Sequence, residues 1–363
     1  MKNKRYYLTP GPSELYFTAA EHMQYALRND LGSISHRSKQ FQEIFQFTTA
    51  QLRQLLNIPS SYHIVFTGSA TEVWQLLLAN CTEQSTYHFV NGSFSSRFYE
   101  FAKELNRNAQ KLEVPFGEGF DISEANIPAE TEMICVTQNE TSAGTCMPVE
   151  DINTLRKEHP EALLVVDAVS AVPYAPIDFE QIDSLFFSVQ KGMGLPAGLG
   201  VWIFNDRCVA RFKALKEKGQ VVPPYHAMDT MLKNAEKHMT QATPNVIGIY
   251  TLGKVAEDMN RRTVEVIRQE TVFKAATIYG LLERHTKFKP FVREEKHRSQ
   301  TVIVADIIDE DYTAATVIEK LEAHGIVVGK GYGEFKDKQI RIANFPTHSK
   351  EIFYQLADVL ETL

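Results

Sequence analysis

The chain has 363 residues, of which 44% are hydrophobic and 23% are charged, with a formal net charge of -7 at pH 7. A chain of this length is expected to form one large and one smaller domain, and an acidic chain without a basic run lacks the footprint of a nucleic-acid-binding protein. The cysteines form no CxxC pair and have no histidine at metal-ligand spacing, which argues against a disulfide framework and a metal site. They are Cys81, Cys135, Cys146 and Cys208.

The first residues are basic but lack the apolar stretch of a signal peptide, and no apolar run is long enough to cross a bilayer. The cysteine usage favours a reducing compartment. We therefore expect a cytoplasmic protein whose partners are small molecules, with no nucleic acid and no membrane among them.

A helix is predicted over 38–57, where apolar residues keep the three-four spacing of one buried face. Seven short apolar runs follow, and several alternate with helical stretches such as "TEVWQLLLAN" and "DINTLRKE". This layout predicts a mostly parallel sheet covered by helices on both faces. The seven predicted strands are 62–67, 86–90, 111–114, 133–137, 163–167, 185–189 and 200–204.

Helical spacing dominates from 245 to 286, which predicts a long connecting helix before a compact second domain. Gly325 stands where a helix C-cap belongs. The predicted organisation is an N-terminal segment at 1–15, a large domain at 16–255 and a small C-terminal domain at 256–363. The predicted elements of the small domain are strand 301–307, helix 312–324, strand 326–328, strand 339–345 and helix 349–362.

Polar residues follow several predicted strands, at the edge where open parallel sheets bind ligands. Asp167 ends "LLVVD", and Lys191 follows "FFSVQ" before a glycine-rich turn. Two interpretations are open for the pair. The residues are either structural, as an ion pair or as two unrelated residues at solvated strand ends, or they are a carboxylate and an amine that face one crevice. The second interpretation makes Lys191 an amine held in a dry site for chemistry.

A small-residue turn, "TGSATE", joins a predicted strand to a predicted helix. Its backbone N–H groups and the hydroxyls of Thr67, Ser69 and Thr71 suit a phosphate, although an ordinary capped helix has the same pattern. An aromatic residue follows one other predicted strand, and two short polar residues follow another. The aromatic residue is either a core residue or a ligand contact, and the polar residues either form the turn or bind a ligand. They are Phe94, Asn139 and Thr141.

Together these strand ends supply the groups that pyridoxal phosphate requires. A lysine amine bonds to the cofactor's aldehyde, and a carboxylate keeps its pyridine nitrogen protonated so that the ring can draw off carbanion charge. The freed amine can then move a proton at the substrate's alpha carbon. The sequence therefore predicts a pyridoxal-phosphate enzyme with Lys191 and Asp167 as its catalytic residues.

The order of these motifs resembles the class V aminotransferase family, of fold type I pyridoxal-phosphate enzymes, over nearly the whole chain. The resemblance implies an α/β fold, with a large domain built on a mostly parallel seven-stranded sheet covered by helices and a small C-terminal α/β domain. The matching pieces are "LTPGPSEL", "SHRSKQF", "TGSATE", "QNETSAGT", "VVDAVSA", "SVQKGMGLPAGLG", "ATPNVIGIYTL" and "IRIANF".

The resemblance also implies roles for single residues around the cofactor ring. Lys191 would carry the cofactor covalently, and Asp167 would be the partner of the pyridine nitrogen. Phe94 would stack on the ring. Thr141 and Gln190 would lie near the ring hydroxyl.

At the cofactor phosphate, the resemblance implies Ala70 and Thr71, with Thr243 reaching it from the neighbouring subunit. A homodimer would then share each site across its interface. Arg341 matches the arginine that binds the substrate's alpha-carboxylate, because a planar guanidinium group can form two parallel hydrogen bonds to a planar carboxylate. Gly11, in "TPGP", is the other implied substrate-binding residue of the same chain.

Within the family, "SHRS" is similar to the phosphoserine aminotransferases, in which a His-Arg pair from the dimer partner receives the substrate's phosphate or side-chain carboxylate. His36 and Arg37 stand in those positions. The resemblance implies a transaminase of serine biosynthesis that makes O-phospho-L-serine and 2-oxoglutarate from 3-phosphohydroxypyruvate and L-glutamate.

Some positions depart from that pattern and keep an alternative open. The stretch "GYGEFKDKQIR" replaces a second His-Arg pair, with Lys330 and Lys336 as its nearby basic residues, Phe94 replaces a tryptophan and Ala242 replaces an asparagine. "TPGP" and "QKGMGLPAGLG" are closer to the alanine-glyoxylate and serine-pyruvate transaminases. An amino acid and a 2-oxo acid are the substrates in either case.

Two further classes are disfavoured. Cysteine desulfurase shares the fold but needs a reactive cysteine on a late loop, and no cysteine follows Cys208. A non-enzymatic protein of this fold would be marked by loss of Lys191 or Asp167, and both are present.

Overall fold

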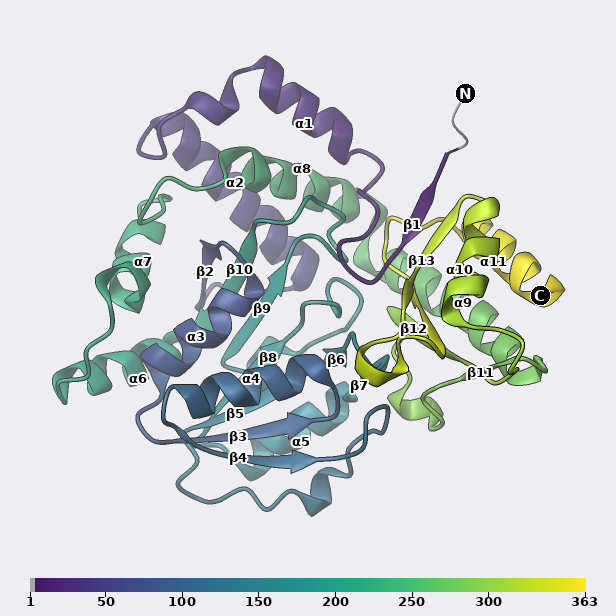
Figure 1. The fold of residues 1–363 in the computed structure, drawn as a ribbon. Helices are drawn as coiled ribbons and strands as arrows, with labels where there is room; N and C mark the ends of the chain where they lie inside the picture. Colours follow the sequence, from purple (N-terminus) through teal and green to yellow (C-terminus); the bar gives the residue numbers. More distant parts are fainter. Residues whose placement is uncertain (1–3) are drawn as a thin grey trace.

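The structure, a computed structural model, describes residues 4–363. Its largest sheet has seven strands in the order β2-β10-β9-β8-β5-β3-β4 (Figure 1). β10 runs antiparallel to both of its neighbours, and the other pairs are parallel. The mostly parallel seven-stranded sheet that the sequence predicts is therefore confirmed. The strands are β2 (Tyr62–Thr67), β3 (Ser85–Val90), β4 (Asn108–Glu113), β5 (Met133–Thr137), β8 (Leu163–Asp167), β9 (Ser184–Ser188) and β10 (Gly200–Asn205).

Helices cover both faces of this sheet, which is why its central strands are mostly apolar. Every residue of β5, β8 and β9 is buried. Along β10, Val201 and Ile203 pack in the core beneath α2 and α8, whereas Trp202 and Phe204 pack in the core beneath α3, α4 and α6. The helices of these two layers are α2 (Lys39–Leu56), α5 (Val149–Glu158) and α8 (Val246–Arg262) on one side and α3 (Ala70–Cys81), α4 (Ser93–Glu104), α6 (Asp206–Glu217) and α7 (Met228–Ala235) on the other.

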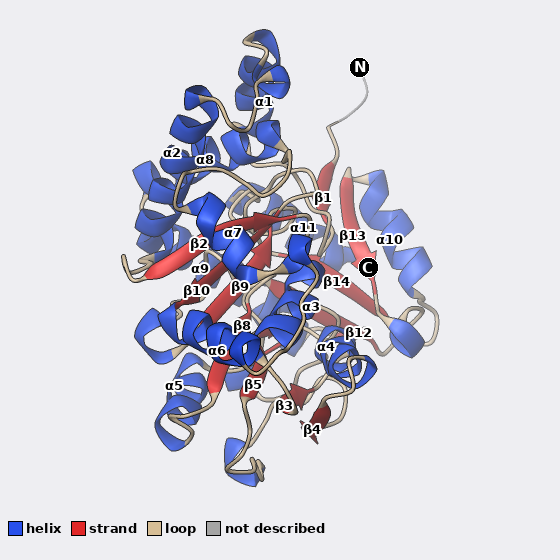
Figure 2. Ribbon diagram, turned by 90° about the vertical axis from the view of Figure 1, so that its left-hand side faces the viewer, coloured by secondary structure: helices blue, strands red, loops and turns tan. Residues whose placement is uncertain are grey.

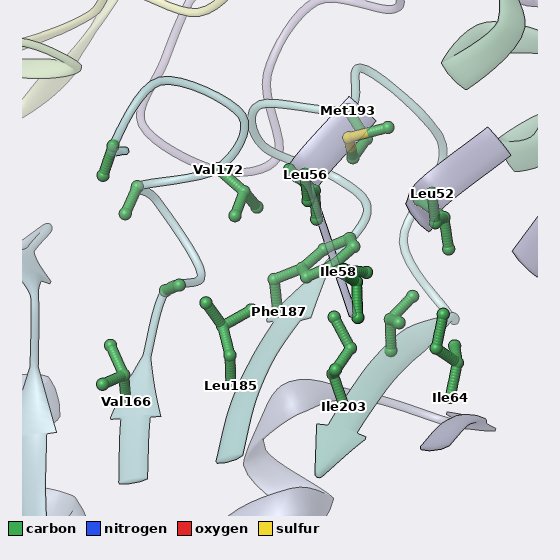
Figure 3. Packing of buried hydrophobic residues seen from close by; sticks show 14 of the residues in the cluster. Leu52, Leu56, Ile58, Ile64, Val166, Val172, Leu185, Phe187, Met193 and Ile203 are labelled. Carbon is green, nitrogen blue, oxygen red and sulfur yellow. The ribbon is translucent and has the colours of Figure 1, made fainter. Parts of the chain in front are cut away.

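Figure 3 shows the first of these cores, where Leu52 and Leu56 of α2 face Leu185, Phe187 and neighbouring strand residues. Figure 2 shows the strands of the large sheet surrounded by helices. Helix α1 (Ala19–Arg28) packs against α8 outside this layer. Short 3-10 turns lie at Leu31–Ser33, Ile122–Glu124, Phe179–Gln181, Pro224–His226, Glu295–His297 and Gly333–Phe335.

The long helix predicted between 245 and 286 is instead two helices, α8 and α9 (Val264–Arg284). The break lies at Thr263, whose φ of 65° is incompatible with a continuing helix. Its hydroxyl accepts a hydrogen bond from Val266 N and so caps α9. The helical spacing was visible in the sequence, but the cap inside it was missed.

A second sheet has five strands in the order β1-β13-β14-β12-β11. Its edge strand β1 (Tyr6–Leu8) comes from the start of the chain and pairs in parallel with β13. Gly325, with φ +77°, follows His324, the C-cap of α10, and leads into β13. The other elements are β11 (Phe288–Pro290), β12 (Val302–Ile307), β13 (Ile326–Lys330), β14 (Gln339–Ala343), α10 (Ala314–Ala323) and α11 (Lys350–Thr362).

A two-stranded hairpin of β6 (Asn139–Glu140) and β7 (Thr145–Cys146) lies between β5 and β8 in the chain. The domain boundaries at 15/16 and 255/256 stay predictions; the second falls inside α8, which packs on α2. Across residues 4–363, no helix combines the length and the apolarity that crossing a bilayer requires.

Candidate active site

A cavity of about 410 Å³ lies at the carboxyl ends of β5, β8 and β9. Thr137, Asp167 and Ser188, the last residues of these strands, line one side of it. Gly329 and Arg341, from β13 and β14 of the second sheet, line another. The cavity therefore lies between the two sheets, at the edge where a parallel sheet binds ligands.

Lys191 and Asp167 both line this cavity and are both buried. Lys191 Nζ donates a hydrogen bond to Thr141 Oγ1 at 2.9 Å and lies 5.1 Å from the centre of the Phe94 ring. The carboxylate of Asp167 accepts hydrogen bonds from Trp74 Nε1 and from the backbone N–H of Val169, each at 3.0 Å. The two groups are thus held by separate partners in one cavity.

Burial shifts both groups away from their charged forms. It lowers the pKa of the Lys191 amine, against the opposing charges of Asp167 and Glu140. It raises the pKa of the Asp167 carboxyl, against its hydrogen bonds to Val169 and Trp74 and the charge of Lys191. A carboxyl and an amine shifted in this way and facing one cavity are typical of a catalytic site.

A hydrogen-bond network around Ser170 fixes the small polar residues. Ser170 Oγ lies 2.7 Å from Thr141 Oγ1 and accepts a hydrogen bond from Asn139 Nδ2 at 2.7 Å. The Thr301 hydroxyl donates to Ser170 O at 2.6 Å. Thr141 and Asn139, both of which line the cavity, are therefore tied to the loop after β8.

The N-terminus of α3 also borders the cavity, where Ala70 and Thr71 line the wall. The backbone N–H of Ala70 donates to Ser188 Oγ at 2.8 Å. The Thr67 hydroxyl donates to Ser69 O, and Ser69 caps its own helix. Of the three hydroxyls singled out in this turn, only that of Thr71 belongs to a cavity residue.

Arg341 is half-buried on β14 and held by two carbonyls. Its Nε donates to Lys330 O at 2.7 Å, and its Nη1 donates to Thr141 O at 3.2 Å. The guanidinium carbon lies 5.2 Å from the centre of the Tyr332 ring, and that ring lies 5.8 Å from Phe94. The cation is thus fixed at the cavity wall beside two aromatic rings.

The N-terminal segment closes the cavity, with Gly11 against Lys191. Ser13 N donates to Gln190 O at 3.1 Å, which ties this segment to the turn after β9. Gln190 lines the cavity, and its buried Oε1 has no hydrogen-bond partner within residues 4–363. A buried acceptor of this kind is suited to a donor on a ligand.

Three predicted site residues lie outside this cavity. Thr243 Oγ1 is 3.4 Å from His36 Nδ1, and Arg37 is exposed beside them. Thr243 instead lines a separate hollow that includes Gly68. The prediction that these three residues serve a neighbouring subunit stays a prediction.

Several residues at or next to the cavity were not predicted from the sequence, among them Trp74, Glu140, Ser188 and Tyr332. Trp74 follows Ala70 by one helical turn, so the helical period alone places both on one side of α3. Ser188 is the last residue of β9, a position that strand-end reasoning covers. Within residues 4–363, no group of three or more His, Cys, Asp or Glu side chains is arranged for a metal ion.

The sequence matches the family Aminotransferase class-V over residues 5–333. The structure is similar to that of a phosphoserine aminotransferase from Cytophaga hutchinsonii, with 48% identity, a TM-score of 0.97 and 99% of each chain covered. A phosphoserine aminotransferase of Rhodococcus opacus is 26% identical over 90% of this chain and 87% of its own.

An alanine-glyoxylate aminotransferase from Nostoc has the same fold, with 21% identity, a TM-score of 0.84, and 100% of this chain and 96% of its own covered. Since the family match covers most of the chain and the fold agrees with it, the chain belongs to the class-V aminotransferases.

Proposed function

We propose that the protein is a pyridoxal-phosphate-dependent transaminase that makes O-phospho-L-serine and 2-oxoglutarate from 3-phosphohydroxypyruvate and L-glutamate. The observation that carries the transaminase chemistry is the buried amine of Lys191 in the same cavity as the buried carboxylate of Asp167. The phosphorylated substrate is supported by the similarity to phosphoserine aminotransferases.

The cavity residues fit this cofactor. Asp167 offers a buried carboxylate for a protonated ring nitrogen, Phe94 offers a ring face, and the N-terminus of α3 offers a site for a phosphate. Oε1 of Gln190, which has no hydrogen-bond partner among the described residues, offers an acceptor for a hydroxyl, and Thr141 lines the same cavity. When bound, pyridoxal phosphate supplies an aldehyde that reacts with amines and a ring that draws electron density from the substrate's alpha carbon.

Lys191 is the residue that we assign to nucleophilic attack and to proton transfer at the alpha carbon. Burial lowers its pKa, so a larger share of the amine is neutral near pH 7 than for a solvated lysine. The hydrogen bond to Thr141 Oγ1 holds the amine toward the cavity. Asp167, held by Trp74 and Val169, keeps a fixed position for the ring nitrogen.

Arg341 is the residue that we assign to the alpha-carboxylate that every amino-acid substrate carries. Its Nε and Nη1 are held by the carbonyls of Lys330 and Thr141, so the guanidinium plane is fixed before substrate binds. A fixed planar fork binds a planar carboxylate with little further loss of side-chain freedom. Gly11 borders the same cavity and completes the assigned substrate site.

We further propose a homodimer in which His36, Arg37 and Thr243 serve the cavity of the partner. They lie together outside the cavity of their own chain, and His36 Nε2 is buried without a hydrogen-bond partner among the described residues. Large apolar side chains are exposed on and before α1, as expected for a surface covered by a second copy. They are Phe17 (62% exposed), Tyr25 (55%) and Leu27 (61%).

The four cysteines are free, which supports a cytoplasmic enzyme because thiols stay reduced there.

The substrate proposal is tested by comparing amino acceptors in a coupled assay. With glutamate as donor, 3-phosphohydroxypyruvate is expected to be the better substrate by kcat/KM. Efficient transfer from alanine to glyoxylate with poor turnover of phosphoserine would replace this proposal by an alanine-glyoxylate type transaminase.

A further inference from the structure

Glu140 is a buried carboxylate, 1% exposed, at the end of β6. It does not line the cavity, but it lies between Asn139 and Thr141, which do. A buried carboxylate is stable only when charged partners or several hydrogen-bond donors surround it. The donors that surround Glu140 are the basis of the inference.

The carboxylate caps α4 from a different part of the chain. Oε2 accepts hydrogen bonds from Phe94 N at 3.1 Å, from Ser95 N at 2.8 Å and from the Ser95 hydroxyl at 2.9 Å. Phe94 and Ser95 belong to the first turn of α4, whose backbone N–H groups have no partner within the helix. The positive end of the helix dipole also favours a carboxylate here.

The second oxygen holds the turn that follows β6. Oε1 accepts hydrogen bonds from Ser142 N at 3.1 Å and from the Ser142 hydroxyl at 2.6 Å. Ser142 Oγ in turn accepts from Ser93 N at 2.9 Å. Ser142 and Glu140 therefore act together to join the turn after β6 to the start of α4.

Gly92, the N-cap of α4, makes this close approach possible. A Cβ added to it would lie 2.5 Å from Glu140 Cδ and 2.7 Å from Ser142 Oγ. No side chain larger than hydrogen fits between the helix start and the carboxylate. The glycine and the glutamate are thus parts of one arrangement.

We propose that Glu140 is a positioning residue, whose carboxylate sets the distance between Phe94 and Thr141. This inference rests on the proposed function, in which Phe94 covers the cofactor ring and Thr141 lies at its edge. Phe94 is held through its backbone N–H, and Thr141 is held because Glu140 and Ser142 on either side of it are fixed. Thr141 Oγ1 then holds the amine of Lys191.

Glu140→Gln tests the proposal because it keeps the shape and replaces one acceptor oxygen with a donor. The amide N–H₂ cannot accept hydrogen bonds from the N–H groups that now donate to Glu140. Either the start of α4 or the turn after β6 therefore loses its hydrogen bonds to this side chain. Glu132→Gln is the matched control. Glu132 Oε2 accepts from the backbone N–H groups of Glu83, Gln84 and Ser85 at 2.8 to 3.0 Å, at the amino end of β5, away from the cavity.

Three quantities are measured on the full chain: the melting temperature without cofactor, the Kd for pyridoxal phosphate by absorbance titration, and the visible circular dichroism per bound cofactor. Both variants are expected to melt below wild type. Only Glu140→Gln should raise the Kd, by about tenfold, since a charged hydrogen bond that orders the site is lost. Only this variant should also change the circular dichroism, which reports how asymmetrically the ring is held.

Equal Kd values and equal circular dichroism for the two variants would overturn the proposal and leave Glu140 as a helix cap alone. If Glu140→Gln does not fold, Ser142→Ala decides, because it removes one donor to Oε1 and the acceptor of Ser93 N. It should raise the Kd about threefold, and an unchanged Kd would again overturn the proposal. Failure of the wild type to bind pyridoxal phosphate would instead overturn the proposed function.

Discussion

A Cβ built on Gly11 would lie 2.8 Å from Lys191 Cε, so the N-terminal segment touches the side chain whose amine enters the cavity. Gly11 also has a φ of +134°, which side chains rarely adopt. The glycine therefore allows the segment to approach Lys191 along its stem.

Gly11→Ala should displace the Lys191 amine. A displacement of about 1 Å at the reacting group can cost about 100-fold in rate, so we expect kcat to fall roughly 10- to 100-fold. Gly219→Ala is the control, because Gly219 has a φ of +92° with nothing within 4 Å of the added Cβ. Both should lose stability, and a similar kcat for both would contradict a specific contact with Lys191.

Lys191→Ala should abolish turnover while the chain stays folded, since the amine is the assigned nucleophile and proton carrier. Borohydride treatment of the cofactor-loaded wild type should attach the cofactor irreversibly to Lys191, as read by peptide mass. Lys274 is the internal comparison, because it too is buried and burial lowers its pKa to about 7. Label on Lys274 or on any other lysine would refute the assignment.

Asp167→Asn keeps the shape of the side chain but removes the charge assigned to the ring nitrogen, together with one of the two acceptor oxygens that Trp74 and Val169 use. We expect kcat to fall by at least about 100-fold, because a preorganised charge at the reacting ring is lost. Trp74→Phe removes one hydrogen bond to the same carboxylate and should cost less. An unchanged kcat in Asp167→Asn would assign the ring nitrogen to another partner.

Arg37→Ala should lower kcat/KM for phosphoserine by about tenfold or more, since a charged hydrogen bond to a phosphate is lost. Transfer between unphosphorylated substrates should hardly change. Arg341→Ala should instead impair every amino-acid substrate, because all of them carry the alpha-carboxylate. If Arg37→Ala lowers kcat/KM equally for phosphorylated and unphosphorylated substrates, Arg37 has a role in dimer assembly rather than in binding the phosphate.

His88 is 1% exposed on β3, and burial lowers its pKa from 6.5 to about 3. The unfolded chain therefore binds a proton between these two pH values that the folded chain does not bind, so acid favours unfolding in this window. Between pH 7 and pH 5 the free energy of unfolding should fall by about 2 kcal/mol through His88.

Urea titrations of wild type and His88→Gln at pH 7, 6 and 5 measure this contribution. The variant starts less stable because the hydrogen bond to Thr86 Oγ1 and the packing against Phe98 are changed. Its free energy should depend less on pH than that of wild type. Parallel pH profiles would show that His88 does not titrate on unfolding in this range.

The parts of the fold with a clear apolar pattern could be predicted from the sequence. The strands 133–137 and 163–167 match β5 and β8 residue for residue, because burial on both faces leaves continuous apolar runs. Asp167 and Lys191 could be placed at one edge of the sheet for the same reason. The pairing of β1 with β13 could not, since three residues near the start of the chain carry no periodic signal and their partner is distant in sequence.

The candidate site was predictable where a residue ends a strand and hidden where a side chain acts on the backbone of another segment. Glu140 was missed because its partners, Phe94 and Ser95, lie more than 40 residues earlier, and no local pattern relates them. Trp74 was missed because a tryptophan inside an apolar helix is usually a core residue, although its Nε1 donates a hydrogen bond to Asp167. Contacts of this kind depend on how two loops meet in space.

The parallel pairing of β1 with β13 also fixes when the cavity can be completed during synthesis. Tyr6–Leu8 is translated long before its partner Ile326–Lys330. Domains near the amino terminus fold as the chain emerges, at roughly 5–20 residues per second. The large sheet, with Asp167 and Lys191 in place, can therefore form well before the segment around Gly11 has the strand on which it docks. The cavity therefore stays open on that side until β13 has been translated, so its closure follows the formation of the large sheet.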